Sequence, residues 1–212
     1  VRIFVILYLF LLVAWPVSLV VTNTFENGLD ALRGIFSDPD LVSALQLSAV
    51  AAVIATALNT VFGVGVSLLL VRHEFPGKWL FSALLDLPLS VSPIVVGLAL
   101  VLVYGGRGGW FGPTLENWGL RIIFSTPGII LATAFVALPL VTREVVPVLK
   151  EIRMEQDQAA RSLGANSWQT FWRVTLPGIK WAVVYGVVLT LARSLGEFGA
   201  VKVVWGNVLG ET

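Results

Sequence analysis

The sequence has 212 residues, of which 57% are hydrophobic and 13% are charged, and its mean hydropathy is +0.87. Soluble domains contain about 25% charged residues, so this composition excludes an ordinary soluble protein. The formal net charge of +1 predicts no binding to nucleic acid, and the lack of cysteine excludes disulfides and thiol chemistry.

Five apolar runs are long enough to cross a bilayer, whose hydrocarbon core of about 30 Å takes roughly 20 helical residues. They cover residues 3–21, 41–71, 79–104, about 122–141 and about 179–204. Closed β-barrels also span membranes, but their strands alternate in hydropathy with a period of two. The runs here are continuous, so we expect an all-α fold, a polytopic transmembrane helical bundle with five visible spans.

The third run contains Pro88 and Pro93, and proline breaks a helix by removing a hydrogen-bond donor. Backbone groups freed at that depth must face protein or a water-filled cavity. Ser90, Ser92 and the helix end after Pro93 are therefore candidates to line a translocation path for an oxyanion. A simple packing kink is the alternative.

Charged residues inside the expected spans are further candidates, because burying a charge in a bilayer costs about 2.5–3.5 kcal/mol. Arg193 and Glu197 are four residues apart in the fifth run. They either neutralise each other across one turn, or form a gate in which Arg193 meets a divalent anion. Asp86 in the third run would repel an anion unless a base from another helix pairs with it.

Loop charges predict the orientation, because Lys and Arg are retained on the cytoplasmic side. Residues 22–40 are mainly acidic and are expected outside, as is the loop at 105–121. Residues 72–78 and the polar segment at about 147–178 are basic and are expected inside. We therefore expect a multi-pass protein of the inner (plasma) membrane, in contact with lipid, with a cytoplasmic amino terminus.

The polar segment, residues 147–178, predicts two short helices. Apolar residues recur at helical spacing from Leu149 to Leu163, and Gly164 can end that helix in the left-handed conformation. Asn166 or Ser167 can cap the next helix.

Three aromatic residues, Trp168, Phe171 and Trp172, would share one face of that next helix. Large aromatics at this spacing suit a groove on another protein, and they equally suit an interfacial helix that rests on lipid. The residues alone leave both interpretations open.

The polar segment resembles the loop that marks permease subunits of ATP-binding-cassette (ABC) importers. Its pattern there is Glu-Ala-Ala, three residues, Gly, nine residues, Ile, any residue, Leu-Pro. The match here runs from Gln158-Ala159-Ala160 through Gly164 to Val174 and Leu176-Pro177. Gln158 replaces the family's Glu, and Val174 replaces its Ile.

In that family the loop is a coupling helix seated in a cleft of the ATPase. The resemblance gives this role to Gln158, Ala159, Ala160, Gly164 and the turn to Trp168. Loss of the carboxylate at 158 would weaken a salt bridge to the ATPase. Asp157 and Glu155 are close enough in the sequence to replace it.

Other stretches resemble the sulfate/thiosulfate permease group, at residues 58–63, 86–93, 109–113 and 192–200. Residues 172–187 resemble its W-type subunit more than its T-type subunit. The Gly-Glu-Phe-Gly element at 196–199 also occurs in molybdate and tungstate permeases.

The resemblance implies a type I ABC importer permease (MetI-like), with one transmembrane permease domain over residues 1–212 and a sixth helix beyond the end of this sequence. It implies import of sulfate or thiosulfate together with an ATPase dimer, a T-type permease and an external, periplasmic sulfate-binding protein. The chain itself would be no enzyme and would hold no cofactor or metal, since ATP binds to the ATPase. The alternatives are a homodimeric molybdate or tungstate permease, an ATP-independent transporter or channel, and a subunit that only anchors a partner.

Overall fold

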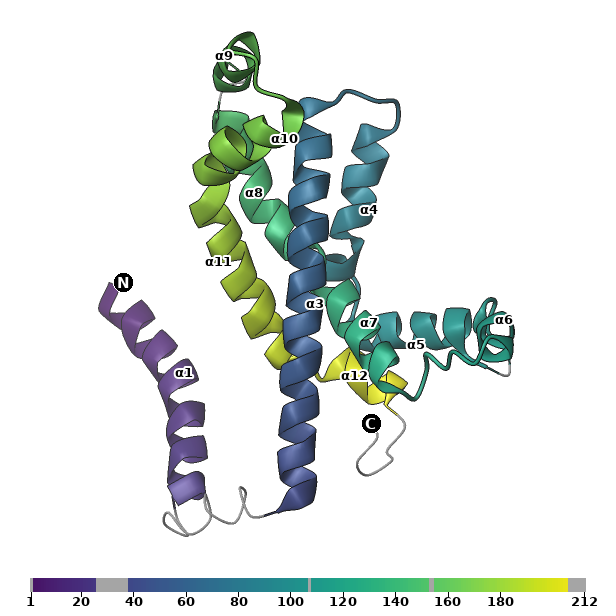
Figure 1. Cartoon of the computed structure of the whole chain (residues 1–212). Helices are drawn as coiled ribbons and strands as arrows, with labels where there is room; N and C mark the ends of the chain where they lie inside the picture. The colour runs from purple at the N-terminus through teal and green to yellow at the C-terminus, as the bar shows by residue number, and fades with distance from the viewer. Residues whose placement is uncertain (1, 26–37, 107, 153–154, 206–212) are drawn as a thin grey trace. The chain divides into compact units, whose positions relative to one another are not determined.

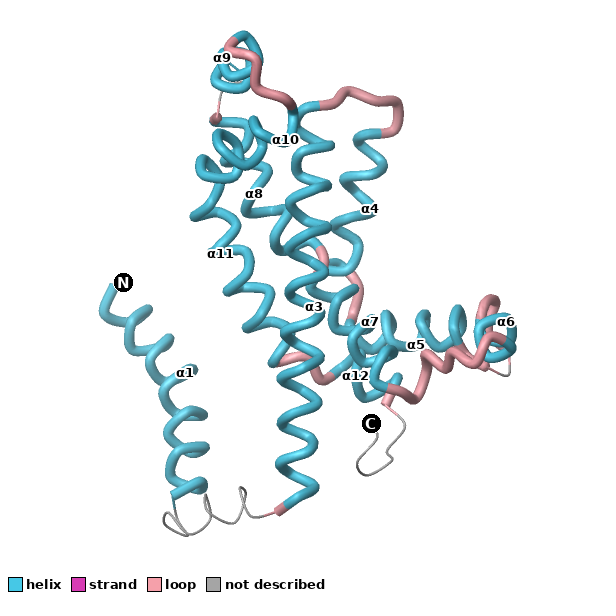
Figure 2. Tube along the Cα trace, viewed as in Figure 1, coloured by secondary structure: helices cyan, strands magenta, loops and turns pink. Residues whose placement is uncertain are grey.

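The computed structural model describes residues 2–25, 38–106, 108–152 and 155–205 (Figure 1). Every regular element in these ranges is a helix (Figure 2), which confirms the predicted all-α fold. Within the described residues, four helical stretches are long and apolar enough to cross a membrane, and a bent pair of helices makes a fifth when it is counted as one span. Most of the acidic loop expected at 22–40 lies outside the described residues.

The described residues divide into two compact units, which separate between Gln46 and Leu47. The first unit holds α1 (Arg2–Phe25) and the start of α3 (Pro39–Arg72). α1 covers the predicted run 3–21, and most of its large apolar side chains are exposed within the chain. Such a surface suits hydrocarbon rather than water.

The rest of α3 lies in the second unit and packs through small residues. Ala51 and Ala55 are buried on it. A Cβ atom on Gly63 would lie 2.7 Å from the Cβ of Val141 in α8 (Pro139–Glu151). α3 thus approaches α8 at a distance that requires glycine, as small residues permit between membrane helices.

The third run forms two helices, α4 (Lys78–Ser90) and α5 (Pro93–Tyr104), which are bent by 113°. The predicted break is confirmed and falls at residues 91–92. Pro88 lies inside α4, so Pro93 at the start of α5 marks the break. The prediction that Pro88 also interrupts the helix is wrong.

The fourth span consists of α7 (Thr126–Ala137) and α8, which together form one stretch of 26 residues. The prediction of a helix over 122–141 is wrong at both ends. Ser125 precedes α7 in an extended conformation, and Leu138 keeps helical angles, so the helix runs on through Pro139. The charged residues of α8 did not end it.

The fifth span runs from Ser167 to Leu195 and includes α10 (Ser167–Thr170), the π-helical stretch η1 (Phe171–Thr175) and α11 (Leu176–Leu195). A separate short helix, α12 (Gly199–Val204), follows. The prediction of one helix over 179–204 is therefore wrong, because the chain turns after Leu195.

The described residues of the second unit form three apolar clusters. The smallest packs Val66 and Leu70 of α3 against Leu85 of α4. Two larger clusters hold the rest of the unit together. One joins α5, α7 and α12 and includes Val96 and Ala200. The other joins α3, α8 and α11 and includes Val145 and Ile179. The second cluster lies toward the end that carries α9 (Glu155–Ser162) and α10, whereas α12 and α5, with α6 (Gly112–Asn117), lie away from that end (Figure 1).

Candidate functional site

The turn between α9 and α10 has the predicted form. Gly164 has a φ of 88°, in the left-handed region, and its N–H donates to the carbonyl of Arg161 at 2.9 Å. A Cβ atom on Gly164 would meet nothing within 4 Å. Glycine is therefore favoured here by the backbone conformation and not by lack of space.

Asn166 caps α10, which confirms one of the two predicted caps. Its Oδ1 accepts the N–H of Gln169 at 2.8 Å, and the N–H of Asn166 donates to Oε1 of Gln169 at 3.0 Å. This reciprocal capping box fixes the start of the helix that carries the aromatic residues.

The predicted aromatic face is confirmed. The ring centroids of Trp168, Phe171 and Trp172 lie 5.5–6.2 Å apart. Trp168 is 69% exposed and Trp172 is 50% exposed. Trp168 and Trp172 therefore offer an exposed aromatic surface next to the turn at Gly164, while Phe171 packs inward.

The predicted helix before Gly164 is confirmed at its end, since α9 ends at Ser162, but the apolar residues from Leu149 to Leu163 do not form one helical face. Leu149 is buried near the end of α8, and Ile152 after it takes an extended conformation. Leu163 is 90% exposed. Leu149 and Ile152 pack in the cluster around Ile179, so the apolar spacing is divided between the end of α8 and the separate helix α9.

The residues that match the coupling motif lie on the outer side of α9. Gln158 and Ala159 are exposed, and Ala160 is half-buried. Asp157 is buried instead and forms an ion pair with Arg72. Contrary to expectation, Asp157 is not available to replace the missing carboxylate at Gln158.

The helix break in the third run exposes both predicted serines. Ser90 and Ser92 are exposed, and Oγ of Ser90 donates to the carbonyl of Asp86 at 3.4 Å. The carboxylate of Asp86 accepts the Nε–H of Arg143 in α8 at 2.9 Å. The base that Asp86 required from another helix is thus present.

Arg193 and Glu197 form the predicted ion pair, with Nη1 and Oε2 2.7 Å apart. The Glu197 side chain is 1% exposed, and its Oε1 also accepts the N–H of Ala200 at 2.8 Å. The pair therefore neutralises itself and also fixes the turn between α11 and α12. Its role as a gate stays a prediction.

The two helix breaks adjoin each other, which the sequence did not indicate. A Cβ atom on Gly199 would lie 3.0 Å from the Cβ of Pro93, and one on Gly97 would lie 2.9 Å from the carbonyl oxygen of Ala200. The structure thus brings the break after Ser92 next to the break after Glu197.

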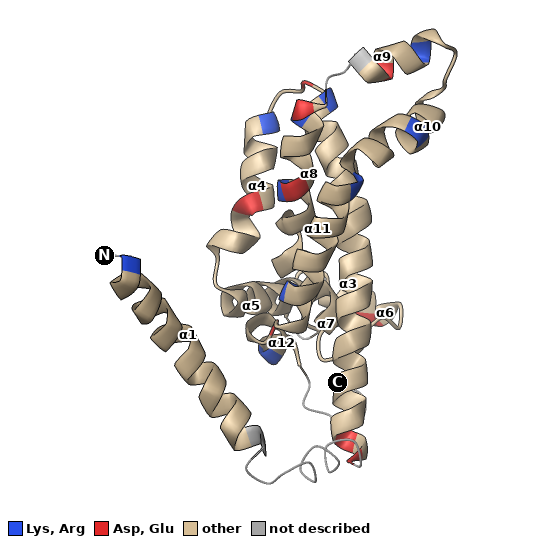
Figure 3. Cartoon of the chain, turned by 90° about the vertical axis from the view of Figure 1, so that its left-hand side faces the viewer, with Lys and Arg blue, Asp and Glu red and all other residues tan. Residues whose placement is uncertain are grey.

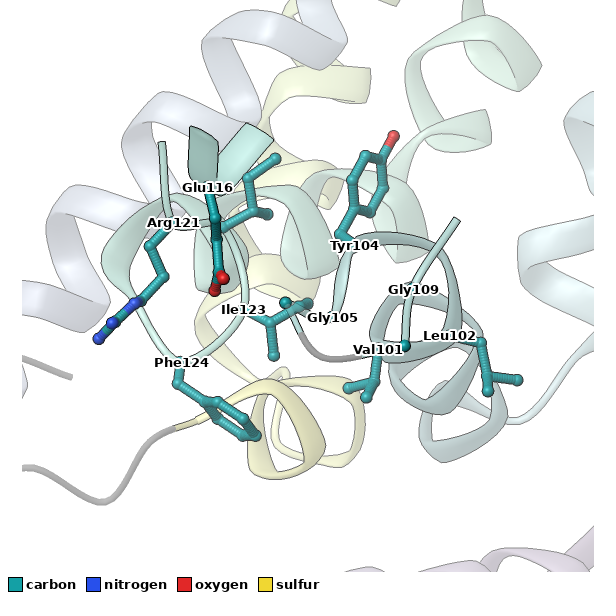
Figure 4. Close-up of a pocket in the computed structure, with 12 residues that line it drawn as sticks. Val101, Leu102, Tyr104, Gly105, Gly109, Glu116, Arg121, Ile123 and Phe124 are labelled. Carbon is teal, nitrogen blue, oxygen red and sulfur yellow. The ribbon is translucent and has the colours of Figure 1, made fainter. Parts of the chain in front are cut away.

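A cavity that we did not predict lies at the end of α5, with a volume of about 510 Å³. Figure 4 shows Glu116 from α6 and Phe124 from the loop before α7 among its lining residues. Phe124 has a φ of 60°, which is unusual for a residue with a side chain. The glycines at 105, 106, 108 and 109 were the available sequence signal, since they line the cavity.

Comparison with known proteins finds a matching family and several relatives. Residues 59–212 match the family described as binding-protein-dependent transport system inner membrane component. The chain is 51% identical, over 97% of its length and 74% of the relative, to the sulfate transport system permease protein CysW of Synechocystis sp.. It is 46% identical to the protein of that name from Escherichia coli K12, over 93% of the chain and 67% of the relative.

The sulfate transport system permease protein CysT of Escherichia coli K12 is 36% identical, over 98% of the chain and 74% of the relative. The stronger similarity to the W-type proteins confirms the resemblance read from residues 172–187. The family match covers residues 59–212, and every regular element described in that range is a helix. This multi-pass membrane chain belongs to the binding-protein-dependent transport system inner membrane component family, the type I permeases of ABC importers.

Proposed function

We propose that this chain is the W-type permease subunit of an ATP-driven importer that carries sulfate or thiosulfate into the cytoplasm. The observation that carries the proposal is its 51% identity to a sulfate transport permease over 97% of the chain. Identity at this level over nearly all the described spans supports a shared substrate class.

The chain works as one transmembrane permease domain beside a T-type permease, and relatives of both types match it. A dimer of ATPase subunits binds and hydrolyses ATP, and an external binding protein delivers the anion. This chain then contributes the pathway and the coupling surface, and no catalytic residue or cofactor.

The polar segment is the coupling surface in this proposal. Trp168 and the exposed side of α9, with Gln158 and Ala159, are free to enter a groove on the ATPase, and Ala160 and Gly164 shape that surface. Basic residues gather at the end of the second unit that carries α9 and α10 (Figure 3). By the positive-inside rule this supports a cytoplasmic position for that end, and with it a cytoplasmic amino terminus.

The adjoining helix breaks are the proposed pathway region. Ser90 and Ser92 carry exposed hydroxyl groups beside one break, and Arg193 with Glu197 stands at the other. A divalent anion that passes there would compete with Glu197 for the guanidinium of Arg193. Such a site is weak and transient, as a transport pathway requires.

The test is reconstitution of the full-length subunit with its T-type partner, ATPase and binding protein in liposomes. We expect ATP-dependent uptake of labelled sulfate that excess molybdate does not block. Preferential uptake of molybdate would assign the chain to the molybdate and tungstate permeases. Sulfate uptake without ATP would contradict the importer assignment.

A further inference from the structure

Arg72, Asp157 and Thr175 form a closed polar network between three helical elements. Nη1 of Arg72 pairs with Oδ2 of Asp157. Nη2 of Arg72 donates to Oγ1 of Thr175 at 3.1 Å, and that hydroxyl donates to Oδ1 of Asp157 at 3.3 Å. Each residue therefore contacts both others.

The three residues come from the end of α3, from α9 and from the last position of η1 before α11. The side chains of Arg72 and Asp157 are 19% and 7% exposed, and Thr175 is 1% exposed. Water therefore screens the pair only weakly, so the two charges interact more strongly than those of a surface ion pair.

Apart from this network, the described side chains of α9 make few buried contacts that could hold it to α3 and α11. Its sequence, Glu-Gln-Asp-Gln-Ala-Ala-Arg-Ser, contains no large apolar side chain. Among those of its side chains that the structure describes, Asp157 is the one that is buried. Leu163, which follows α9, is 90% exposed and so provides no apolar anchor.

On the side of the network that faces α10, the helices are not closely packed. A cavity of about 330 Å³ adjoins it and is lined by Arg72 and Thr175 together with Arg161 and Phe171. α9 and α10 thus have space to shift against α3 if the network is broken.

We propose that Arg72, Asp157 and Thr175 are positioning residues that join α9 to the ends of α3 and α11, and that movement of the ATPase reaches the spans through this joint. The proposal rests on the function proposed above. Buried ion pairs contribute little net stability compared with apolar replacements, and their best-supported role is to fix one arrangement among several. The joint acts in that way: it makes α9 and the two membrane helices move as one body.

Asp157→Asn tests the joint, because it keeps the shape of the side chain and removes its charge. In the reconstituted complex we expect ATP hydrolysis to continue while the amount of sulfate transported per ATP falls by about fivefold or more, within the usual range of coupling between sites. Glu74→Gln is the matched control, since Glu74 is an 88% exposed carboxylate two residues from Arg72 and pairs with Lys78 instead of with the joint. An unchanged ratio of transport to hydrolysis in Asp157→Asn would overturn the proposal.

A second measurement does not depend on transport. The 212 residues contain no cysteine, so after replacement of any cysteine elsewhere in the full-length subunit, spin labels can be placed on the exposed positions His73→Cys and Ser162→Cys in nanodiscs. We expect a single narrow distance distribution that broadens in Asp157→Asn and stays narrow in Glu74→Gln. A distribution that stays narrow in Asp157→Asn would overturn the joint. If the wild-type complex transports no sulfate, the proposed function fails, and this distance measurement still decides whether the joint exists.

Discussion

Arg193 and Glu197 form a 2.7 Å ion pair at the point where α11 ends, and Glu197 holds the first turn of α12 through the N–H of Ala200. One buried carboxylate thus connects a membrane-spanning helix with a short helix that packs on α5. Glu197 fixes the second helix break, and the break in the third run lies against it at Pro93 and Gly199.

Glu197→Gln should lower ATP-dependent sulfate uptake, because Arg193 loses its counter-charge. The turn itself should remain, since the amide oxygen can still accept the N–H of Ala200. Arg193→Gln should lower uptake by about tenfold or more, since a hydrogen bond to a charged group contributes about 1.5–3 kcal/mol. Uptake by proteoliposomes at several sulfate concentrations measures both effects.

The double variant Arg193→Gln/Glu197→Gln separates the two interpretations of the pair. If Arg193 meets the anion, the double variant stays as inactive as Arg193→Gln. Recovery of uptake in the double variant would show that the two charges only neutralise each other and would contradict the gate.

Gly63→Ala should destabilise the protein by about 1–3 kcal/mol, because the added methyl group would lie 2.7 Å from the Cβ of Val141. Gly65→Ala is the matched control on the same helix, where a Cβ atom meets nothing within 4 Å. That change should be neutral or stabilising by up to about 1 kcal/mol, since alanine is the better helix former. Thermal unfolding in detergent measures both, and equal midpoints for the two variants would contradict the close approach of α3 to α8.

Gly164→Val should reduce transport per ATP, because a β-branched residue strongly disfavours the φ of 88° that shapes the turn before α10. Gly164→Asn should retain most of the coupling, since asparagine tolerates the left-handed conformation. The amount of subunit inserted in the membrane should be unchanged in both variants. Equal transport by the valine and asparagine variants would argue against a role for this turn.

Trp168→Ala should weaken binding of the ATPase to the permease by about 2 kcal/mol, the size expected for a tryptophan at the centre of an interface. That is roughly 30-fold in Kd, because about 1.4 kcal/mol corresponds to a factor of ten. Trp118→Ala is the control, since Trp118 is 74% exposed but belongs to the loop after α6. Binding of the purified ATPase to nanodisc-embedded permease gives the Kd, and an unchanged value for Trp168→Ala would favour a lipid-facing role for the aromatic face.

Local signals in the sequence were sufficient for the turn at Gly164, the cap at Asn166 and the aromatic face at Trp168. Each depends on residues within one or two turns of the same chain segment. The helix boundaries were less accurate: the fourth span continues beyond the predicted end at residue 141 to Glu151, and α11 ends at Leu195 before the apolar run is complete. Composition does not distinguish a continuing helix from a turn inside a membrane, because both are built from the same apolar residues.

By itself, the sequence determined the helical class, the approximate spans and the position of the polar segment. These follow from long apolar runs, which must satisfy their backbone hydrogen bonds within a helix. Only the tertiary structure decided that Asp157 is buried against Arg72 instead of facing a partner. It also decided that Thr175 bonds to Arg72, 103 residues away in the chain, and that α5 packs on α12. The physical reason is that such contacts depend on how separate helices pack, and periodicity within one helix does not specify its neighbour.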